Sequence, residues 1–197
     1  MTRPSDATAT NAAPAVPTAA RSVRAWVIFA ILTAGGLAAD LASKALVFEW
    51  LGRTAPTTGS RVIVPGVLHF HRSTNPGVVF GVDWIPDLVV IGFTILAMGV
   101  VIYFFVVSPR RAPWMHGALA MILAGALGNL VDRVTIGEVR DFIDFSPWRA
   151  GPFNYPWIFN VADVLLVAGV GILMVLSMME WHRERLAARA AGPPDQA

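Results

Sequence analysis

The stretch LVVIGFTILAMGVVIYFFVV, residues 88–107, carries no ionisable side chain other than Tyr103. A helix needs about 20 apolar residues to cross a hydrocarbon core of roughly 30 Å, so this stretch predicts a transmembrane helix. Three further stretches of similar character are expected to span the membrane, at about 25–46, 114–133 and 157–179. We therefore predict an all-α polytopic membrane protein with four transmembrane helices.

The composition of the whole chain agrees with a membrane protein. Of the 197 residues, 55% are hydrophobic and 14% are charged, whereas soluble domains carry roughly 25% charged residues. This argues against a cytosolic enzyme and a disordered protein, and a net charge of +2 is too small for a phosphate-binding surface. The absence of cysteine excludes disulfides, thiolate metal sites and a cysteine nucleophile. His69 and His71 alternate on a possible strand, but without an evident third ligand we expect no metal site.

The chain divides into three expected parts. Residues 1–23 predict a disordered cytoplasmic tail, 24–181 the four-span domain, and 182–197 a cytoplasmic C-terminal tail. Between the first two spans, residues 61–72 are partly apolar and interrupted by Pro65-Gly66, which predicts a bent strand or hairpin. We therefore expect a small extracytoplasmic β-containing loop domain between helices 1 and 2.

The first span has a competing interpretation. Arg21 and Arg24, an apolar run and then small residues are typical of a cleavable secretory signal peptide. The three later spans would keep the chain in the membrane in either case. We favour retention of the segment, because Asp40 and Lys44 at its end lie at the same depth as the other polar groups of the spans.

The arginines near the span ends predict the orientation. Dense clusters precede the first span, join the second and third spans, and follow the fourth: Arg21 and Arg24, Arg110 and Arg111, and Arg183, Arg185 and Arg189. With four spans all three clusters lie on one side, which the positive-inside rule assigns to the cytoplasm. We expect a multi-pass membrane protein with both termini cytoplasmic.

With this orientation, the strong polar groups of the spans gather at the outer boundary of the membrane. Asp40 and Lys44 are four residues apart on one helical face, a spacing that favours pairing. Asn160 and Asp163 are three apart at the outer start of the last span. The third span contributes Asn129, Asp132 and Arg133 at its outer end. Its small residues, among them Gly125 and Gly128, permit close helix approach and predict a central position in the bundle.

Several readings of these groups stay open on the residues alone. Asp40 with Lys44 fits an interfacial ion pair that fixes the depth of the span, and Asp132 beside Arg133 fits a helix cap. An acid inside a span, such as Asp163, is a functional hypothesis by default. The loop acids Asp141 and Asp144 cannot be distinguished from each other.

Two other classes of protein remain to be weighed. A small channel or carrier could use Asp163 and Asp40 as a proton or cation path. Such a path predicts polar groups through the full depth of the membrane, whereas here they occupy the outer third. A structural scaffold subunit would leave the Asn and Asp clusters unexplained.

Five ordered segments between about residues 25 and 180 resemble the motifs of the lipoprotein signal peptidase family (signal peptidase II). The segments are Asp40-Leu-Ala-Ser-Lys44, Asn75-Pro-Gly77-Val-Val-Phe80-Gly81, Gly125-Ala-Leu-Gly-Asn129-Leu-Val-Asp132-Arg133, Val139-Arg-Asp141-Phe-Ile-Asp144-Phe145 and Phe159-Asn160-Val-Ala-Asp163. The chain departs from the family pattern at Leu41, where glutamine is common, and at Arg140, where an apolar residue is more usual. If the side chain of Arg140 folds back, it would lower the pKa of Asp141.

The resemblance implies an aspartic endopeptidase of the bacterial plasma (inner) membrane, without cofactor or metal. Its substrates would be diacylglyceryl-modified prolipoproteins, cut before the lipidated cysteine, and globomycin-type cyclic peptides would inhibit it. By carry-over onto the matching positions, Asp141 and Asp163 form the catalytic pair. Two further groups of residues follow from the same motifs: Asn75, Asn129, Arg133 and Asn160 for substrate binding and transition-state positioning, and Asp40, Lys44, Gly77 and Asp132 in support.

Paired carboxylates suit peptide hydrolysis in a chain without a thiol or a metal. Two like charges at short range cannot both ionise, so the pair shares a proton. One member then takes a proton from water while the other donates a proton toward the scissile carbonyl.

Overall fold

The computed structural model describes residues 17–76, 86–145, 149–150, 153–154 and 158–190. Four long helices dominate it: α1 (Val23–Thr54), α2 (Asp87–Val107), α3 (Pro113–Ile136) and α4 (Val161–Ala190). Each is long and apolar enough to cross a membrane. The four-helix prediction is therefore confirmed.

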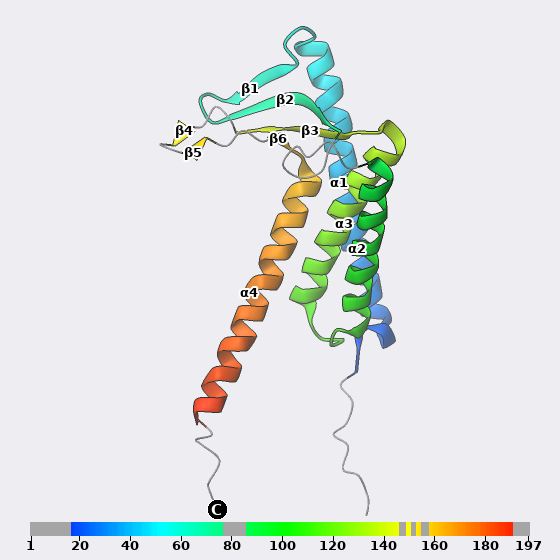
Figure 1. The fold of residues 1–197 in the computed structure, drawn as a ribbon, viewed down its shortest axis with the longest axis vertical. Coiled ribbons are helices and arrows are strands. Elements are labelled where there is room, and N and C mark those ends of the chain that lie inside the picture. The colour runs from blue at the N-terminus through cyan, green and yellow to red at the C-terminus, as the bar shows by residue number, and fades with distance from the viewer. Residues whose placement is uncertain (1–16, 77–85, 146–148, 151–152, 155–157, 191–197) are drawn as a thin grey trace, which may run out of the picture.

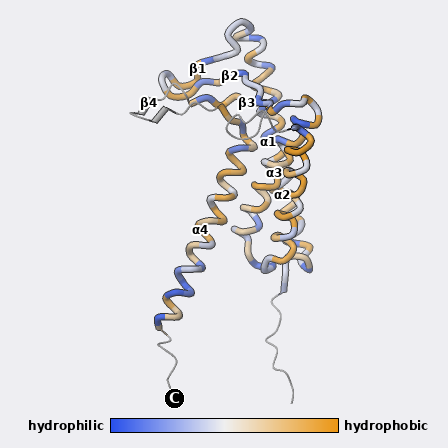
Figure 2. Tube along the Cα trace, in the orientation of Figure 1, coloured by the Kyte–Doolittle hydropathy of each residue, from blue (hydrophilic) through white to orange (hydrophobic). Residues whose placement is uncertain are grey.

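Two helices have different bounds from the predicted spans. α1 continues past residue 46 to Thr54, and its last turns stand beyond the bundle at the end that carries the sheet (Figure 1). α4 begins at Val161 rather than at Trp157, because Ile158 and Phe159 belong to a strand. α4 also continues to Ala190, where its hydropathy has become polar (Figure 2). Hydropathy marks the membrane-embedded part of a helix and not its hydrogen-bonded length.

The segment before α1 is ordered from Pro17 onward. Ala19–Arg21 form a short 3-10 helix, η1. The backbone nitrogen of Ala19 donates to the carbonyl of Ser108 at 2.8 Å, and that of Arg110 donates to the carbonyl of Pro17 at 3.0 Å. These bonds tie the segment to the loop between α2 and α3. The described residues 17–22, which composition placed in the predicted tail, thus hold backbone hydrogen bonds that composition does not reveal.

α3 lies at the centre of the bundle, as its small residues predicted. It packs against α1, α2 and α4, and its buried face includes Ala120, Ala124 and Gly128. A Cβ on Gly125 would lie 2.4 Å from the carbonyl oxygen of Ala162, so only glycine permits this approach to α4. The helix ends at Gly137, whose φ of 86° is the left-handed conformation that favours glycine.

A four-stranded antiparallel sheet covers one end of the bundle (Figure 1). Its order is β1 (Ser60–Val64), β2 (Leu68–Asn75), β3 (Val139–Asp144) and β6 (Ile158–Phe159). The predicted hairpin is confirmed by β1 and β2, with Gly66 at φ 73° in the turn. The sheet also takes β3 and β6 from the loop between α3 and α4, so the β region is shared by both loops. Two short strands, β4 (Arg149–Ala150) and β5 (Phe153–Asn154), pair separately.

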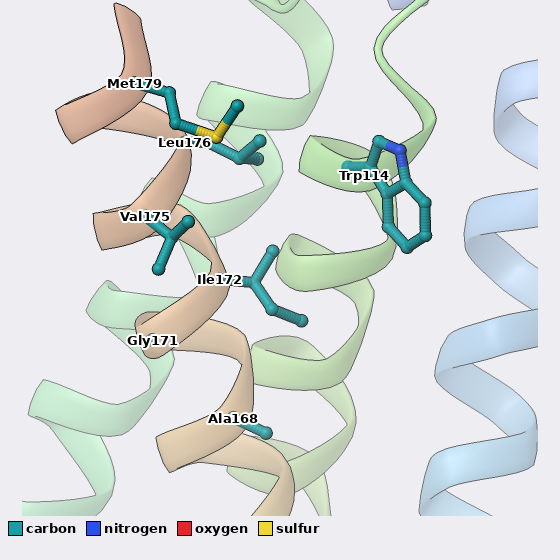
Figure 3. Close-up of a pocket in the computed structure, with 7 residues that line it drawn as sticks. All are labelled: Trp114, Ala168, Gly171, Ile172, Val175, Leu176 and Met179. Carbon is teal, nitrogen blue, oxygen red and sulfur yellow. The ribbon is translucent and has the colours of Figure 1, made fainter. Parts of the chain in front are cut away.

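An apolar groove lies at the opposite end of the bundle from the sheet, where α4 diverges from the start of α3 (Figures 1 and 3). Its volume is about 520 Å³, and seven residues line it: Trp114, Ala168, Gly171, Ile172, Val175, Leu176 and Met179. Six of the seven come from α4. The groove is remote from the polar residues described next.

Candidate active site

Asp141 and Asn160 meet where the sheet joins the helices. Asp141 lies on β3 and is only 4% exposed, while Asn160 immediately precedes α4. The side-chain nitrogen of Asn160 donates to Asp141 Oδ1 at 2.7 Å. β2 borders the same strand, and the side chain of its Asn75 also hydrogen-bonds to Asp141. Asp141 is therefore held by neutral amides from both sides.

Asn160 also fixes Asp163 at the start of α4. The backbone nitrogen of Asn160 donates to Asp163 Oδ2 at 3.1 Å, and the backbone nitrogen of Asp163 donates to Asn160 Oδ1 at 3.0 Å. This reciprocal arrangement is a capping box built from Asn and Asp. The other carboxylate oxygen of Asp163 accepts from the side-chain nitrogen of Asn129 at 2.9 Å. One asparagine, Asn160, thus contacts both carboxylates.

Lys44 is a buried cation behind these asparagines. Its Nζ lies 2.7 Å from Asp40, 3.2 Å from Asp132 and 3.0 Å from Asn129 Oδ1, to which it donates. The side chains of Lys44, Asp40 and Asp132 are all 0% exposed. The pairing of Asp40 with Lys44 is confirmed, but the pair sits inside the protein and not at an exposed interface.

The contacts of Lys44 decide how Asn129 is oriented. Asn129 Oδ1 accepts from both Lys44 Nζ and, at 3.1 Å, the side-chain nitrogen of Asn160. Because Lys44 can only donate, the oxygen of Asn129 must face it, which turns the amide nitrogen toward Asp163. Lys44 of α1 thus determines that the side-chain nitrogen of Asn129, and not its oxygen, reaches Asp163.

Asp40 has a second task at the start of α4. Its Oδ1 accepts from the backbone nitrogen of Ala162 at 2.8 Å. The first turn of a helix leaves backbone N–H groups without an intrahelical partner, and a carboxylate there is favoured by the helix dipole. Asp40 therefore joins α1 to the turn that carries Asp163.

Asp132 binds Arg140 instead of capping α3. The guanidinium of Arg140 reaches Asp132 Oδ1 at 2.6 Å through Nη2 and at 3.2 Å through Nε, and the backbone nitrogen of Arg140 donates to Asp132 Oδ2 at 3.0 Å. The condition considered from the sequence, that the side chain of Arg140 folds back toward Asp141, is not met, because its guanidinium binds Asp132. Successive side chains of a strand point to opposite faces, so Arg140 turns toward α3 when Asp141 turns toward Asn160.

The electrostatics of Asp141 are those of a carboxyl group that holds a proton. Burial, and then the negative charge of Asp163, raise the pKa of Asp141 from 3.8 to about 7. Hydrogen bonds from Asn160 and Asn75, together with the charge of Lys44, act in the opposite direction. Arg133, at the end of α3, interacts electrostatically with both Asp163 and Asp141.

The structure separates the two loop acids that the sequence could not. Asp144 lies three residues beyond Asp141 on β3, so its side chain points to the other face of the strand. In the ladder it is paired with His69 of β2 and Ile158 of β6. Asp141 is the acid that meets Asn160. Gly77, expected in a supporting role, lies outside the described residues.

Of the expected site residues, the structure brings Asn75, Asn129, Asn160, Asp141 and Asp163 together, with Asp40, Lys44 and Asp132 behind them. Sequence reasoning missed the pairing of Arg140 with Asp132. The unusual charge next to Asp141 was the available signal, but its partner lies on another element, eight residues away.

Comparisons with known proteins agree on one family. The family model described as signal peptidase (SPase) II matches residues 32–179. A lipoprotein signal peptidase of Desulfitobacterium hafniense is 37% identical over 123 residues, which cover 62% of this chain and 77% of the relative. The lipoprotein signal peptidase of Chlorobium phaeovibrioides is 33% identical over 156 residues, covering 76% and 88%.

A solved structure supports the fold independently. It is described as a bacterial membrane enzyme determined by the in meso method at 2.3 Å resolution, and it superposes with a TM-score of 0.62 at 28% sequence identity. The match covers 80% of this chain and 88% of that structure.

Proposed function

The chain belongs to the signal peptidase II family of membrane proteases that process prolipoproteins, and from this premise we infer that Asp141 and Asp163 are its catalytic pair. The substrate we propose is a prolipoprotein whose cysteine already carries diacylglycerol, cut on the N-terminal side of that cysteine. The observation that supports the pair is its connection through Asn160, which hydrogen-bonds to both carboxyl groups.

In the proposed reaction the pair shares one proton, which Asp141 retains up to about pH 7 because its pKa is raised to about 7. Asp163 takes a proton from the attacking water, and Asp141 donates its proton to the scissile carbonyl oxygen. Collapse of the tetrahedral intermediate breaks the C–N bond: the proton held by Asp163 passes to the leaving nitrogen, and Asp141 recovers its proton from a hydroxyl group of the intermediate, which becomes the new carboxyl group. Acid–base assistance of this kind contributes roughly 10²- to 10⁴-fold to the rate.

The amides around the pair are suited to positioning and charge stabilisation. Asn129 and Asn160 donate toward the carboxylates, and we assign them contact with the substrate backbone or the developing oxyanion. Asn75 and Arg133 are assigned to substrate contact. Lys44, Asp40 and Asp132 support the site from behind by holding Asn129 and the start of α4 in place.

We propose that the sheet end of the bundle faces outward across the bacterial plasma membrane and that both termini are cytoplasmic. The arginines of the α2–α3 loop and of the end of α4 lie at the opposite end from the sheet (Figure 1), as the positive-inside rule requires. The diacyl chains of the substrate would then remain in the outer leaflet at the depth of Asp163. The four-span domain would comprise residues 24–181, and globomycin-type cyclic peptides would compete for the site.

The test compares three aspartate-to-asparagine variants in a gel-shift assay on diacylglyceryl-modified prolipoprotein. Asp141→Asn and Asp163→Asn should each abolish cleavage while the protein still inserts, because either change removes one half of the acid–base pair. Asp144→Asn is the matched control on the same strand and should keep most of the activity. Full activity of Asp141→Asn or Asp163→Asn would refute the pair, and loss of activity in Asp144→Asn alone would show that the wrong loop acid was chosen.

A further inference from the structure

Four charged side chains form a balanced cluster beneath the acid pair. Asp40 and Lys44 come from α1, Asp132 from α3 and Arg140 from β3. Three of them are 0% exposed, and the side chain of Arg140 is 21% exposed. Two carboxylates face two cations, so the cluster is neutral only when Arg140 is included.

Arg140 connects this cluster to the strand of Asp141 through three separate groups. Its guanidinium grips Asp132 through Nη2 and Nε, and its backbone nitrogen donates to the same carboxylate. Its backbone carbonyl accepts from the side-chain nitrogen of Asn160 at 3.3 Å. A planar guanidinium that binds a carboxylate through two nitrogens adds geometric restraint as well as energy. Arg140 therefore holds β3 against α3 at the residue next to Asp141.

We propose that Arg140 is a positioning residue for the hydrolysis: it neutralises Asp132 and anchors β3, which keeps Lys44 on Asn129 and Asp141 against Asn160. The inference rests on the proposed catalytic role of Asp141 and Asp163. Arg140 occupies a position where the family pattern usually has an apolar residue. The restraint on β3 therefore comes from an arginine that this chain has and the family pattern lacks.

The distances show what the loss of Arg140 would do. Without it, Asp132 keeps its ion pair with Lys44, whose Nζ is 3.2 Å away. A buried carboxylate that loses a partner draws the remaining cation toward it, because an uncompensated buried charge is costly. Movement of Lys44 toward Asp132 releases Asn129 Oδ1, 3.0 Å away, and frees the amide that reaches Asp163. Small misplacements of this kind reduce rates by up to about 100-fold.

The experiment measures kcat and KM of Arg140→Gln, Arg140→Lys and the wild type on a diacylglyceryl-modified prolipoprotein peptide. Arg140→Gln should lower kcat about 10- to 100-fold with a smaller change in KM, because the acid pair and Asn129 are displaced while Arg133, also assigned to substrate contact, is not. Arg140→Lys restores the charge without the two-nitrogen grip and should recover part of the loss. Arg53→Gln is the matched control: it removes an exposed arginine that pairs with Glu49 at the end of α1, and it should behave as the wild type.

The pH profile distinguishes positioning from a general loss of folded protein. Asp141 is faced by Asp163 from α4, Lys44 from α1 and Arg133 from α3. In Arg140→Gln the negative charge of Asp132 is no longer neutralised by the guanidinium. This added negative charge favours the neutral carboxyl group of Asp141, so the alkaline limb of kcat/KM should move to higher pH. A variant that is merely less stable would lose activity without this shift.

A double variant keeps the proposal testable if Arg140→Gln accumulates poorly. Asp132→Asn with Arg140→Gln leaves no lone buried charge and should fold. Because the two residues act through one contact, it should be no less active than the poorer single variant. Three results would overturn the inference. They are a loss of kcat in the double variant equal to the product of the two single losses, a wild-type kcat in Arg140→Gln, and equal losses of kcat in Arg140→Gln and Arg140→Lys. Cleavage by Asp163→Asn, assayed in parallel, would instead refute the catalytic pair.

Discussion

Gly128 in α3 offers a sharp test of how closely the helices are packed beneath the acid pair. The perturbation is Gly128→Ala, a single added methyl group. In an open helical position this change stabilises by about 1 kcal/mol, because alanine has the higher helix propensity. At Gly128 the new Cβ would lie 2.3 Å from Asp40 Oδ2 and 2.9 Å from its Cγ. We therefore expect the opposite sign.

The magnitude follows from what Asp40 would have to give up. Ordinary contact begins at 3.4 Å, so the carboxylate must retreat by about 1 Å. Asp40 is fully buried, and its oxygens contact Lys44 Nζ at 2.7 Å and the Ala162 nitrogen at 2.8 Å. Loss of a hydrogen bond to a charged group costs about 1.5–3 kcal/mol, and overpacking adds about 1–3 kcal/mol. After the gain in helix propensity, the free energy of unfolding should fall by about 2–4 kcal/mol.

The assay is thermal unfolding of the detergent-solubilised protein, followed by tryptophan fluorescence, together with prolipoprotein cleavage. A loss of this size corresponds to a Tm lower by about 5–15 °C. Gly117→Ala is the matched control on the same helix, since its added Cβ meets nothing within 4 Å; its Tm should be unchanged or higher. Equal Tm values for the two variants, or wild-type cleavage by Gly128→Ala at all temperatures, would refute the reasoning.

Two further predictions concern the charges of the site. The pKa of Asp141 is raised from 3.8 to about 7, so folding favours its neutral form. This contribution to the free energy of unfolding is fully present below about pH 3.8 and is lost as the pH rises through about 7. The value of kcat/KM should also fall above about pH 7, because the shared proton leaves. Asp163→Asn should lower the pKa of Asp141, measured by carboxyl carbon NMR, and an unchanged value would show that the two acids do not interact. Lys44→Met leaves the buried carboxylates of Asp40 and Asp132 short of a cation and should destabilise the protein by about 3–5 kcal/mol, whereas Asp40→Asn combined with Lys44→Met should recover much of that loss in thermal unfolding. A single Lys44→Met variant as stable as the wild type would contradict the role of Lys44 as a shared partner.

Local spacing predicted the contacts made within one helix turn. Asp40 and Lys44 pair as their four-residue separation indicated, and Asn160 and Asp163 meet through the first turn of α4. In both cases the periodicity of the helix places the side chains together. The same logic predicted the turn at Gly66, because proline followed by glycine is a local signal.

Contacts between elements could not be read in this way. Lys44 and Asn129 are 85 residues apart, and their meeting depends on how α1 crosses α3. The pairing of β2 with β3 joins two loops, and no local pattern in either loop predicts that they pair. Arg140 shows the limit most clearly: its neighbour in the chain is Asp141, but its partner is Asp132, because strand geometry turns adjacent side chains to opposite faces.

The order of β3 and α4 along the chain has a consequence for biosynthesis. Asn160 and Asp163, which complete the site, belong to the last helix, whereas Asp141 precedes it on β3. A nascent chain that has inserted α1 to α3 holds Asp141 without its partner acid and without the donor of its 2.7 Å hydrogen bond. With the two acids acting as the proposed pair, proteolytic capacity arises only after α4 has been synthesised and has packed against α3.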